Sequence, residues 1–523
     1  MTPDANAVTH FIDRHLAQGR GARIAFTEVG GAGRQLSYDA LAQGTARVAG
    51  ALARAGIRRE ERVAMVVLDQ TEFPLIFWGC LRAGVVPVPL NTLLASSVYA
   101  TILADARPAA VIVSAELWAV VAPALAGCDS LRHVIVIDGK PGGGEAVVGA
   151  VGFDAFMDGA EPAGTVPTSG DEVAFWLYSS GSTGQPKGVR HVHDSLRATA
   201  DTYGAQVLGI TADDRIHSVA KLFFAYGLGN GMTFPMSVGA EALLYAGRPT
   251  PDSALSVIRD ERPTIFCGVP TLYAALIAHL EGQGGQAGGH ALRRCISAGE
   301  ALPKEVGQRW KALWGTDVLD GVGSTEMLHI FLSNRADDLA YGTSGLPVPG
   351  YEMRLVDEAG AEVGAGEVGE LLVRGPSAAD GYWNKRHKTR TTFEGEWTRT
   401  GDKYERREDG RLVYCGRTDD MFKVSGIWVS PFEVEQALID HPAVLEAAVV
   451  AARDADGLEK PKAFVVAKPG QAVDAASLKE FVKDRIGKWK YPRWVELVDD
   501  LPKTATGKIQ RFKLREDRQE KGL

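Results

Sequence analysis

The sequence predicts an α/β protein: a large N-terminal domain of parallel sheets flanked by helices, a β-rich subdomain, and a small α+β C-terminal domain. Its 523 residues exceed what one hydrophobic core usually organises. From about residue 60, short β-branched runs alternate with helix-length segments, which is typical of parallel sheets covered by helices. We therefore expect an N-terminal domain at 1–418, with a Gly-rich, strand-like subdomain at about 341–415, and a C-terminal domain at 419–523.

The local pattern predicts the individual elements. Apolar, β-branched runs predict strands at 63–68, 110–113, 133–137, 174–178, 264–267 and 294–297. Helix-length segments lie between many of them, at 71–83, 252–262, 271–280 and 303–314. Further strands at 351–356 and 369–374 belong to the β-rich subdomain. Ligands of such folds collect at the carboxyl ends of strands, so we expect functional residues at 179–188, 298–300 and 321–326.

Composition narrows the class of protein. Acidic residues outnumber basic ones by 65 to 57, for a formal net charge of -8, which argues against nucleic acid as the main partner. The 5 cysteines form no C-x-x-C pair and are expected to be reduced thiols. The most apolar stretch, 111–127, contains Glu116 and is too short to span a membrane. The N-terminus does not resemble a secretory signal, so we expect a cytoplasmic protein without a membrane partner.

The segment 178–189 is the most informative one. It follows an apolar strand and combines hydroxyl side chains, glycines and Lys187. Glycines let backbone N–H groups approach an anion, and a lysine adds positive charge, so the segment predicts a phosphate-binding loop. Its spacing does not match G-x-x-x-x-G-K-[ST], which disfavours a Walker-type NTPase. The alternative is a flexible Ser/Gly surface linker.

Six motifs occur in order along nearly the whole chain. They are the segments 178–189, 297–303, 323–326, 397–402, 416–420 and 502–508. Together they resemble the acyl-adenylate-forming superfamily of acyl-CoA synthetases, firefly-type luciferases and peptide-synthetase adenylation domains. The resemblance implies that a carboxylate attacks the α-phosphorus of ATP, that pyrophosphate leaves, and that a thiol then displaces AMP. It therefore implies ATP, Mg²⁺ and coenzyme A.

The resemblance also implies residue roles. Lys508 would bridge the substrate carboxylate and the α-phosphate, Thr325 would lie near the α-phosphate, and Glu326 would bind Mg²⁺. The C-terminal domain would be mobile, with its hinge at Asp419 and pantetheine passing Gly426. The remaining nucleotide contacts would come from Ser180, Gly181, Ser182, Thr183, Gly184 and Lys187 for the phosphates, Gly299, Glu300, Ala301, Asp320 and Gly321 for adenine, and Asp402 and Arg417 for the ribose.

The sequence departs from the superfamily at Val322, where an aromatic residue commonly stacks on adenine. The segments 221–229 and 327–330 resemble benzoate-CoA ligases, and aromatic and branched side chains favour a flat ring. Benzoate is the first choice of acid, with ring substituents left open because one group changes binding by only about 1–3 kcal/mol in an apolar pocket. The predicted pocket residues are Phe224, Ala225, Tyr226, Gly323, His329 and Ile330.

Several alternatives remain open at this point. The chain could load an aryl acid onto a carrier protein in trans, or it could be a catalytically silent sensor of nucleotide and aryl acid. His191 and His193 flank a valine, but no third ligand is placed by spacing, so we interpret them as structural rather than metal-binding. A homodimer and a lysine acetyltransferase acting on Lys508 are further hypotheses about partners.

Overall fold

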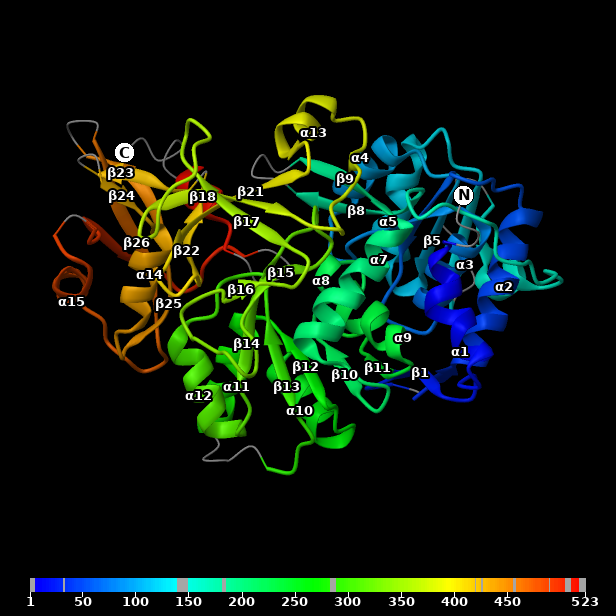
Figure 1. Cartoon of the computed structure of the whole chain (residues 1–523), viewed down its shortest axis with the longest axis horizontal. Helices are drawn as coiled ribbons and strands as arrows, with labels where there is room; N and C mark the ends of the chain where they lie inside the picture. The colour runs from blue at the N-terminus through cyan, green and yellow to red at the C-terminus, as the bar shows by residue number, and fades with distance from the viewer. Residues whose placement is uncertain are drawn as a thin grey trace.

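The computed structural model describes residues 5–31, 33–138, 149–180, 185–282, 288–418, 420–424, 427–454, 458–488, 490–503 and 509–516. Figure 1 shows the N-terminal segments at one end of the molecule and the C-terminal segments at the other, with residues of about 200–400 between them. The α/β class is confirmed. Among the described residues, no helix is long and apolar enough to cross a membrane.

The largest sheet has nine strands in the order β16-β15-β14-β13-β12-β10-β11-β1-β2. Its central strands are parallel, whereas β15, β16 and β2 are added antiparallel at the two edges. The strand bounds are β1 Ile24–Glu28, β2 Gln35–Ser37, β10 Arg215–Ser218, β11 Glu241–Leu244, β12 Ile265–Gly268, β13 Arg294–Ser297, β14 Val318–Gly323, β15 Ile330–Ser333 and β16 Leu346–Pro347.

A second parallel sheet has the order β4-β3-β5-β6-β7. Its strands are β3 Arg62–Val66, β4 Val86–Pro89, β5 Ala110–Ser114, β6 His133–Ile137 and β7 Val151–Gly152. Every residue of β5 is buried, as expected for a strand covered on both faces. The predicted parallel strands of this region are therefore confirmed, with shifts of a residue or two at some ends.

The predicted strand at 174–178 differs from the others. It is part of β8 (Val173–Ser180), which pairs antiparallel with β9 (Pro186–Val192) in a three-stranded sheet completed by β19 (Gly381–Tyr382). The expectation of a parallel strand was wrong here. Two strands joined by so short a segment can only form a hairpin, because a parallel connection needs a crossover of about a dozen residues or more.

The β-rich region contains a five-stranded antiparallel sheet, β17-β18-β21-β20 with β22 paired to β21. Its strands are β17 Glu352–Val356, β18 Val368–Arg374, β20 Phe393–Glu394, β21 Trp397–Arg406 and β22 Leu412–Arg417. The C-terminal strands are β23 Phe422–Val424, β24 Ile427–Val429, β25 Val444–Arg453, β26 Glu459–Ala467 and β27 Trp494–Leu497.

Helices cover the sheets, and several begin with side-chain caps. Ser37 accepts a hydrogen bond from the Ala40 N–H, and Thr250 forms a capping box with Ser253. The α-helices are α1 Arg14–Ala17, α2 Tyr38–Arg54, α3 Glu72–Ala83, α4 Ser96–Ala106, α5 Trp118–Val121, α6 Phe153–Met157, α7 His193–Thr199, α8 Ala225–Leu228, α9 Phe234–Val238, α10 Pro251–Asp260, α11 Pro270–Gly282, α12 Lys304–Trp314, α13 Arg386–Thr392, α14 Pro431–Ile439, α15 Ala475–Ile486 and α16 Arg511–Glu516. Further helical turns of π or 3₁₀ type are Thr9–Asp13, Ala115–Leu117, Ala122–Gly127, Ala200–Leu208 and Gly229–Thr233.

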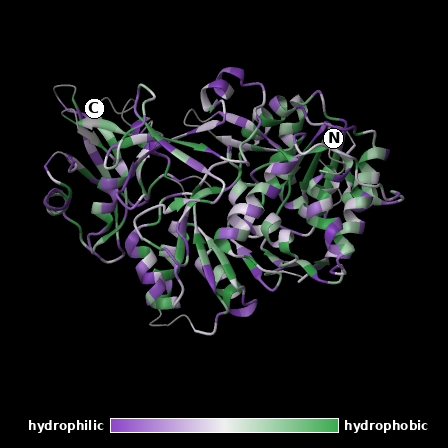
Figure 2. Ribbon diagram, in the orientation of Figure 1, coloured by the Kyte–Doolittle hydropathy of each residue, from purple (hydrophilic) through white to green (hydrophobic). Residues whose placement is uncertain are grey.

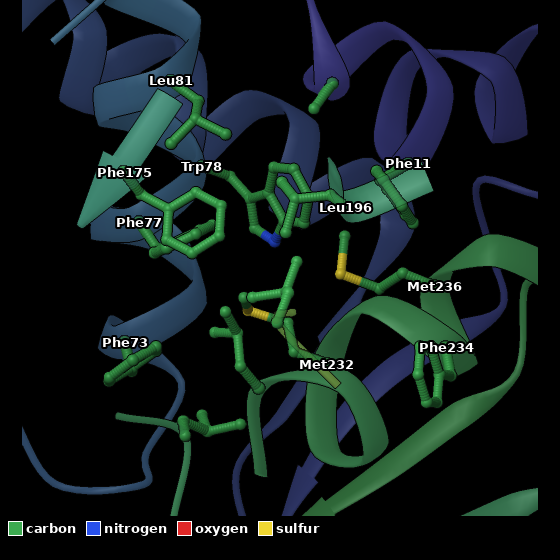
Figure 3. Close-up of a cluster of buried hydrophobic side chains, with 14 of the residues drawn as sticks. Phe11, Phe73, Phe77, Trp78, Leu81, Phe175, Leu196, Met232, Phe234 and Met236 are labelled. Atoms are coloured by element: carbon green, nitrogen blue, oxygen red, sulfur yellow. The ribbon is translucent and has the colours of Figure 1, made fainter. Parts of the chain in front are cut away.

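The main core joins segments that are distant in the chain. Figure 3 shows Phe11, Trp78, Phe175 and Met232 converging on one apolar cluster. Apolar residues concentrate in the sheet strands, while the outer helices are mixed or hydrophilic (Figure 2). Burial of this apolar surface is the main stabilising contribution, and the core takes in Phe175 and Leu177 of β8.

Candidate active site

The hairpin β8–β9 is anchored near the end that carries the predicted phosphate loop. The Tyr178 hydroxyl donates to Asp105 Oδ2 at 2.6 Å, and the indole Nε1 of Trp383 donates to the Asp105 carbonyl at 2.9 Å. The Trp383 ring also packs on Trp176, with centroids 4.8 Å apart. These contacts position the strand ends from which the predicted phosphate loop extends.

Lys187, on β9, contacts the predicted Mg²⁺ ligand. Its Nζ lies 3.0 Å from Glu326 Oε1 and 3.1 Å from the Tyr382 hydroxyl, and that hydroxyl donates to Glu326 Oε1 at 2.8 Å. Burial by itself would raise the pKa of Glu326, but the Lys187 charge and the Tyr382 hydrogen bond together bring it below its usual value. Glu326 is therefore a carboxylate, and Lys187 is its counter-ion.

The turn that carries Thr325 and Glu326 follows β14 and is held from several sides. His191 Nε2 lies 2.8 Å from the Thr325 carbonyl, and the Ala379 N–H donates to the Glu326 carbonyl at 2.8 Å. The Ser324 hydroxyl accepts from the Met327 N–H at 3.2 Å. We call Lys187, His191, Thr325, Glu326 and Tyr382 the clamp.

Asp402 and Arg417 are brought together by sheet register. They are paired residues on β21 and β22, and Arg417 Nη1 donates to Asp402 Oδ1 at 2.8 Å and to the Thr400 carbonyl at 3.0 Å. Gly401 has φ +72°, and a Cβ there would lie 2.9 Å from the Arg417 guanidinium, so a side chain would strain this corner. The predicted ribose contacts thus form one unit.

The predicted adenine contacts lie at the carboxyl ends of two neighbouring parallel strands. Gly299, Glu300 and Ala301 follow β13, while Asp320 and Gly321 are in β14, with Ser297 paired to Asp320. Burial raises the pKa of Asp320 well above its usual value. Glu300 Oε1 accepts a hydrogen bond from the Ile509 N–H at 3.3 Å.

The acyl-pocket prediction brings together Tyr226, Gly323 and His329. His329 is buried and lies 3.3 Å, through Nε2, from the Tyr226 carbonyl; burial lowers its pKa to about 3. A Cβ on Gly323 would lie 2.5 Å from the His329 carbonyl, so the glycine permits this close approach. The Tyr226 hydroxyl donates to the carbonyls of Gly268 and Ile296 at 3.1 and 3.2 Å.

The other predicted pocket residues, Phe224, Ala225 and Ile330, contact residues outside the group of Tyr226, Gly323 and His329. Phe224 contacts Phe223, with ring centroids 4.4 Å apart, and Ala225 is half-buried against the main core. Ile330 is buried and lies against Gly321, where a Cβ would be 2.9 Å from its side chain.

Sequence reasoning missed three aromatic residues. Tyr203 and Phe234 pack on His329 with centroids 5.3 and 4.5 Å away, and Tyr382 completes the clamp. Nothing in their local sequence distinguishes them from core residues. Seven predicted site residues lie outside the described residues: Gly181, Ser182, Thr183, Gly184, Asp419, Gly426 and Lys508. Ser180 is described as the last residue of β8, without its side chain.

The donors of the clamp fit Mg²⁺ that arrives with substrate phosphates. Among the described residues, no three His, Cys, Asp or Glu side chains form a metal-binding group. Mg²⁺ is commonly held by one or two carboxylates plus phosphate oxygens rather than by an all-protein cage, which one carboxylate such as Glu326 can satisfy.

Comparison with known proteins identifies the class. The AMP-binding enzyme family matches residues 13–383, and the AMP-binding enzyme C-terminal domain matches residues 433–508. The chain belongs to the family of AMP-binding enzymes, which confirms the predicted resemblance.

Two relatives are similar along almost their entire length. The 4-hydroxybenzoate–CoA/benzoate–CoA ligase of Rhodopseudomonas palustris is 51% identical over 98% of this chain and 94% of that protein. The benzoate–CoA ligase of Thauera aromatica is 52% identical over 98% of this chain and 95% of that protein.

Two solved structures are similar to this chain over nearly its whole length. A benzoate CoA ligase from Burkholderia xenovorans LB400 has a TM-score of 0.89 at 49% identity, over 98% of this chain and 99% of that one. The anthranilate CoA ligase AuaEII in complex with anthranoyl-AMP has a TM-score of 0.91 at 40% identity, over 98% and 97% of the two chains.

Proposed function

We propose that this protein is an AMP-forming ligase that converts benzoate, or a closely related aromatic carboxylate, and CoA to the aryl-CoA thioester with ATP. The observation that carries the proposal is the aromatic enclosure of His329 beside the clamp. Tyr203, Tyr226 and Phe234 surround its imidazole. Aromatic surroundings three residues along the chain from Glu326 suit a ring that carries one carboxylate.

The charge of the surroundings supports a monocarboxylate. Lys221, the cation at the edge of the segment 221–229, lies 4.0 Å from the buried carboxylate of Asp69 and donates to the Tyr245 carbonyl. It is thereby neutralised within the protein. A second carboxylate on the acid would have to be buried without a free positive partner in this segment, which is costly.

The reaction proceeds in two displacements. A carboxylate oxygen of the acid attacks the α-phosphorus of ATP, the bond to the bridging oxygen of the β-phosphate breaks, and pyrophosphate leaves. The thiol sulfur of CoA, as it loses its proton, then attacks the acyl carbon, and the bond to the AMP oxygen breaks. Negative charge gathers at phosphorus in the first step, so positive groups and hydrogen-bond donors aimed there lower its barrier.

We assign the charged groups to the first step. Lys508 would stabilise charge between carboxylate and α-phosphate, and Lys187 would turn from Glu326 to the leaving phosphates as Mg²⁺ joins that carboxylate. Asp402 would accept from the ribose hydroxyls, with Arg417 beside it. The hydrogen bond from Ile509 to Glu300 supports this assignment, because the residue that follows Lys508 contacts the candidate nucleotide site.

We propose a domain boundary near residue 418, with Asp419 as hinge, Gly426 beside the pantetheine path and a mobile C-terminal domain at 419–523.

We also propose a cytoplasmic location, a homodimer, and acetylation of Lys508 by an acetyltransferase. Acetylation removes the lysine charge, so a Lys508-acetylated protein should lose acyl-AMP formation; unchanged activity would argue against it.

A panel of aromatic acids tests the function. Pyrophosphate release and thioester formation are measured with ATP, CoA and each acid, and the acids are ranked by kcat/KM. We expect benzoate near the top and dicarboxylates at the bottom. Pyrophosphate release without transfer to CoA, but with transfer to a carrier protein, would favour the loading enzyme. Absence of pyrophosphate release with every acid would favour the silent sensor.

A further inference from the structure

His191 is a buried histidine at the back of the clamp. It is on β9, its side chain has no solvent exposure, and its ring stacks on Phe175 with centroids 5.2 Å apart and planes at 20°. Its Nε2 lies 2.8 Å from the backbone carbonyl of Thr325, which is 134 positions away in the chain. It therefore connects the hairpin to the turn after β14.

The protonation state of this imidazole follows from its partners. A carbonyl can only accept, so Nε2 carries the hydrogen and donates it. Nδ1 is buried and has no hydrogen-bond partner among the described residues. Burial also lowers the pKa of His191 to about 4, so the ring is neutral near pH 7. The residue is a neutral donor with one unsatisfied acceptor.

The unpaired Nδ1 argues that a histidine is present at this position for the hydrogen bond that its Nε2–H donates. An unpaired buried nitrogen costs free energy, and an aromatic hydrocarbon would fill the same space beside Phe175 without that cost. What only a polar ring can supply at this position is the hydrogen bond to the Thr325 carbonyl.

Strand β9 also contacts Glu326, the residue that follows Thr325. Lys187 and His191 are four positions apart on β9, so their side chains leave the same face of the strand. Lys187 contacts the Glu326 carboxylate at 3.0 Å while His191 contacts the Thr325 carbonyl. One strand thus determines where both residues of the turn lie relative to the hairpin. When phosphates bind, Lys187 can exchange Glu326 for a phosphate as its partner. The hydrogen bond between neutral His191 and the Thr325 carbonyl does not compete with phosphate and stays formed.

We propose that His191 is a positioning residue for ATP activation: its hydrogen bond keeps Thr325 and Glu326 in register with the phosphate-binding hairpin when Lys187 changes partner. This inference rests on the proposed function. Misplacement of such groups by about 1 Å can cost on the order of 10²-fold in rate, so the contact is worth more to the first step than to stability alone.

His193 offers a matched control. It is two residues further on, is 3% exposed, and its Nδ1 accepts a hydrogen bond from the Ala7 N–H at 3.2 Å. It is as buried as His191 and lies in the same part of the chain, but its contact is with the N-terminal segment rather than with the clamp. Loss of this contact should affect folding without a specific effect on ATP.

The test compares His191→Phe, His191→Gln and His193→Phe with the wild type. Acyl-AMP formation is measured as pyrophosphate release over a range of Mg²⁺ concentrations, and the second step as thioester formation from supplied benzoyl-AMP. We expect His191→Phe to slow the first step about tenfold, the equivalent of one lost hydrogen bond, to raise the Mg²⁺ needed for half-maximal rate, and to change the second step less than about threefold. His191→Gln, which retains an N–H donor, should recover part of the loss, and His193→Phe should leave the ratio of the two rates unchanged.

A binding measurement separates this inference from the proposed function. The rise in Tm caused by Mg²⁺ and ATP is recorded for each protein without any acid. A smaller rise in His191→Phe than in the wild type supports the positioning role even if benzoate proves not to be the substrate. An equal rise, or an equal loss of both half-reactions, would overturn it.

Discussion

Two clusters of charged side chains in this protein have similar burial and different construction. In the clamp, Lys187 and Glu326 are 17% and 16% exposed and meet through one ammonium at 3.0 Å. In the C-terminal anchor, which consists of Asp420, Glu435, Arg511 and Arg515, the Arg511 and Glu435 side chains are 20% and 5% exposed. Arg511 donates twice to Glu435, at 3.0 and 2.7 Å, and the Val449 N–H donates to the same carboxylate at 2.7 Å.

The two clusters differ in whether the cation can change its partner. An ammonium is a point charge that can turn to another anion at little geometric cost, whereas a guanidinium fork matches one carboxylate in one orientation. The clamp pairs Lys187, which is predicted to bind the phosphates, with Glu326, which is predicted to bind Mg²⁺. The anchor pairs residues that hold the helix α16, just after Lys508, to α14 and to Asp420. The first cluster is suited to change partner, and the second to keep it.

The largest expected effect is at Lys508, the functional charge that the anchor would support. Lys508→Ala should reduce acyl-AMP formation by about 10³-fold, since it removes the charge that stabilises the first transition state. Thioester formation from supplied acyl-AMP should be spared. Stopped-flow or quench measurements of the two half-reactions check this, and equal loss of both would contradict the role given to Lys508.

The next effect concerns the clamp. Glu326→Gln should slow acyl-AMP formation about 10²-fold and weaken the dependence on Mg²⁺, because an amide is a poorer ligand than a carboxylate. Steady-state rates over a range of Mg²⁺ concentrations measure it. Glu396→Gln is the control, since Glu396 is 77% exposed and, among the described residues, forms an ion pair only with surface Arg374. A Glu326 variant that behaves like this control would show that the carboxylate has no part in catalysis.

A smaller effect should distinguish the anchor from the clamp. Arg511→Lys keeps the charge and loses the fork, so we expect a loss of about 2 kcal/mol in the free energy of unfolding of the C-terminal part. Urea titration measures it. Arg485→Lys is matched, because the Arg485–Asp440 pair at 3.3 Å belongs to the same part of the chain but is about half exposed. If both variants lose equally little, the anchor is not a stabilising device.

The smallest effect, taken per unit of pH, is the contribution of His191 to acid sensitivity. Its folded pKa of about 4 lies below its ordinary value of 6.5, so the unfolded chain binds the proton first as the pH falls. Its stabilisation is complete above about pH 6.5 and is lost on the way down to about pH 4. His191→Phe should therefore flatten the pH dependence of the unfolding free energy by about 1 kcal/mol per pH unit in that window. Chemical denaturation at several pH values checks this, and an unchanged slope would mean that folding does not lower the pKa of the ring.

Much of the fold followed from local pattern. The strands at 133–137 and 294–297 have the predicted bounds, because β-branched runs between helices leave few alternatives. The segment 174–178 looked the same by that criterion and proved to be part of an antiparallel hairpin. Periodicity reports burial and spacing, whereas the direction of pairing depends on what the next strand does.

The sequence by itself determined the inventory of the site: a Ser/Thr/Gly-rich segment with Lys187, the pair Thr325 and Glu326, and the terminal Lys508, in an order that a family shares. Only the tertiary structure decided which of these residues meet. Lys187 and Tyr382 are 195 positions apart, and His191 and Thr325 are 134 apart, yet each pair is in hydrogen-bond contact. The first contact joins neighbouring strands of one sheet, β9 and β19, and the second joins that sheet to the turn after β14. Both depend on the summed burial of many apolar side chains, which leaves no local sign in the residues it brings together.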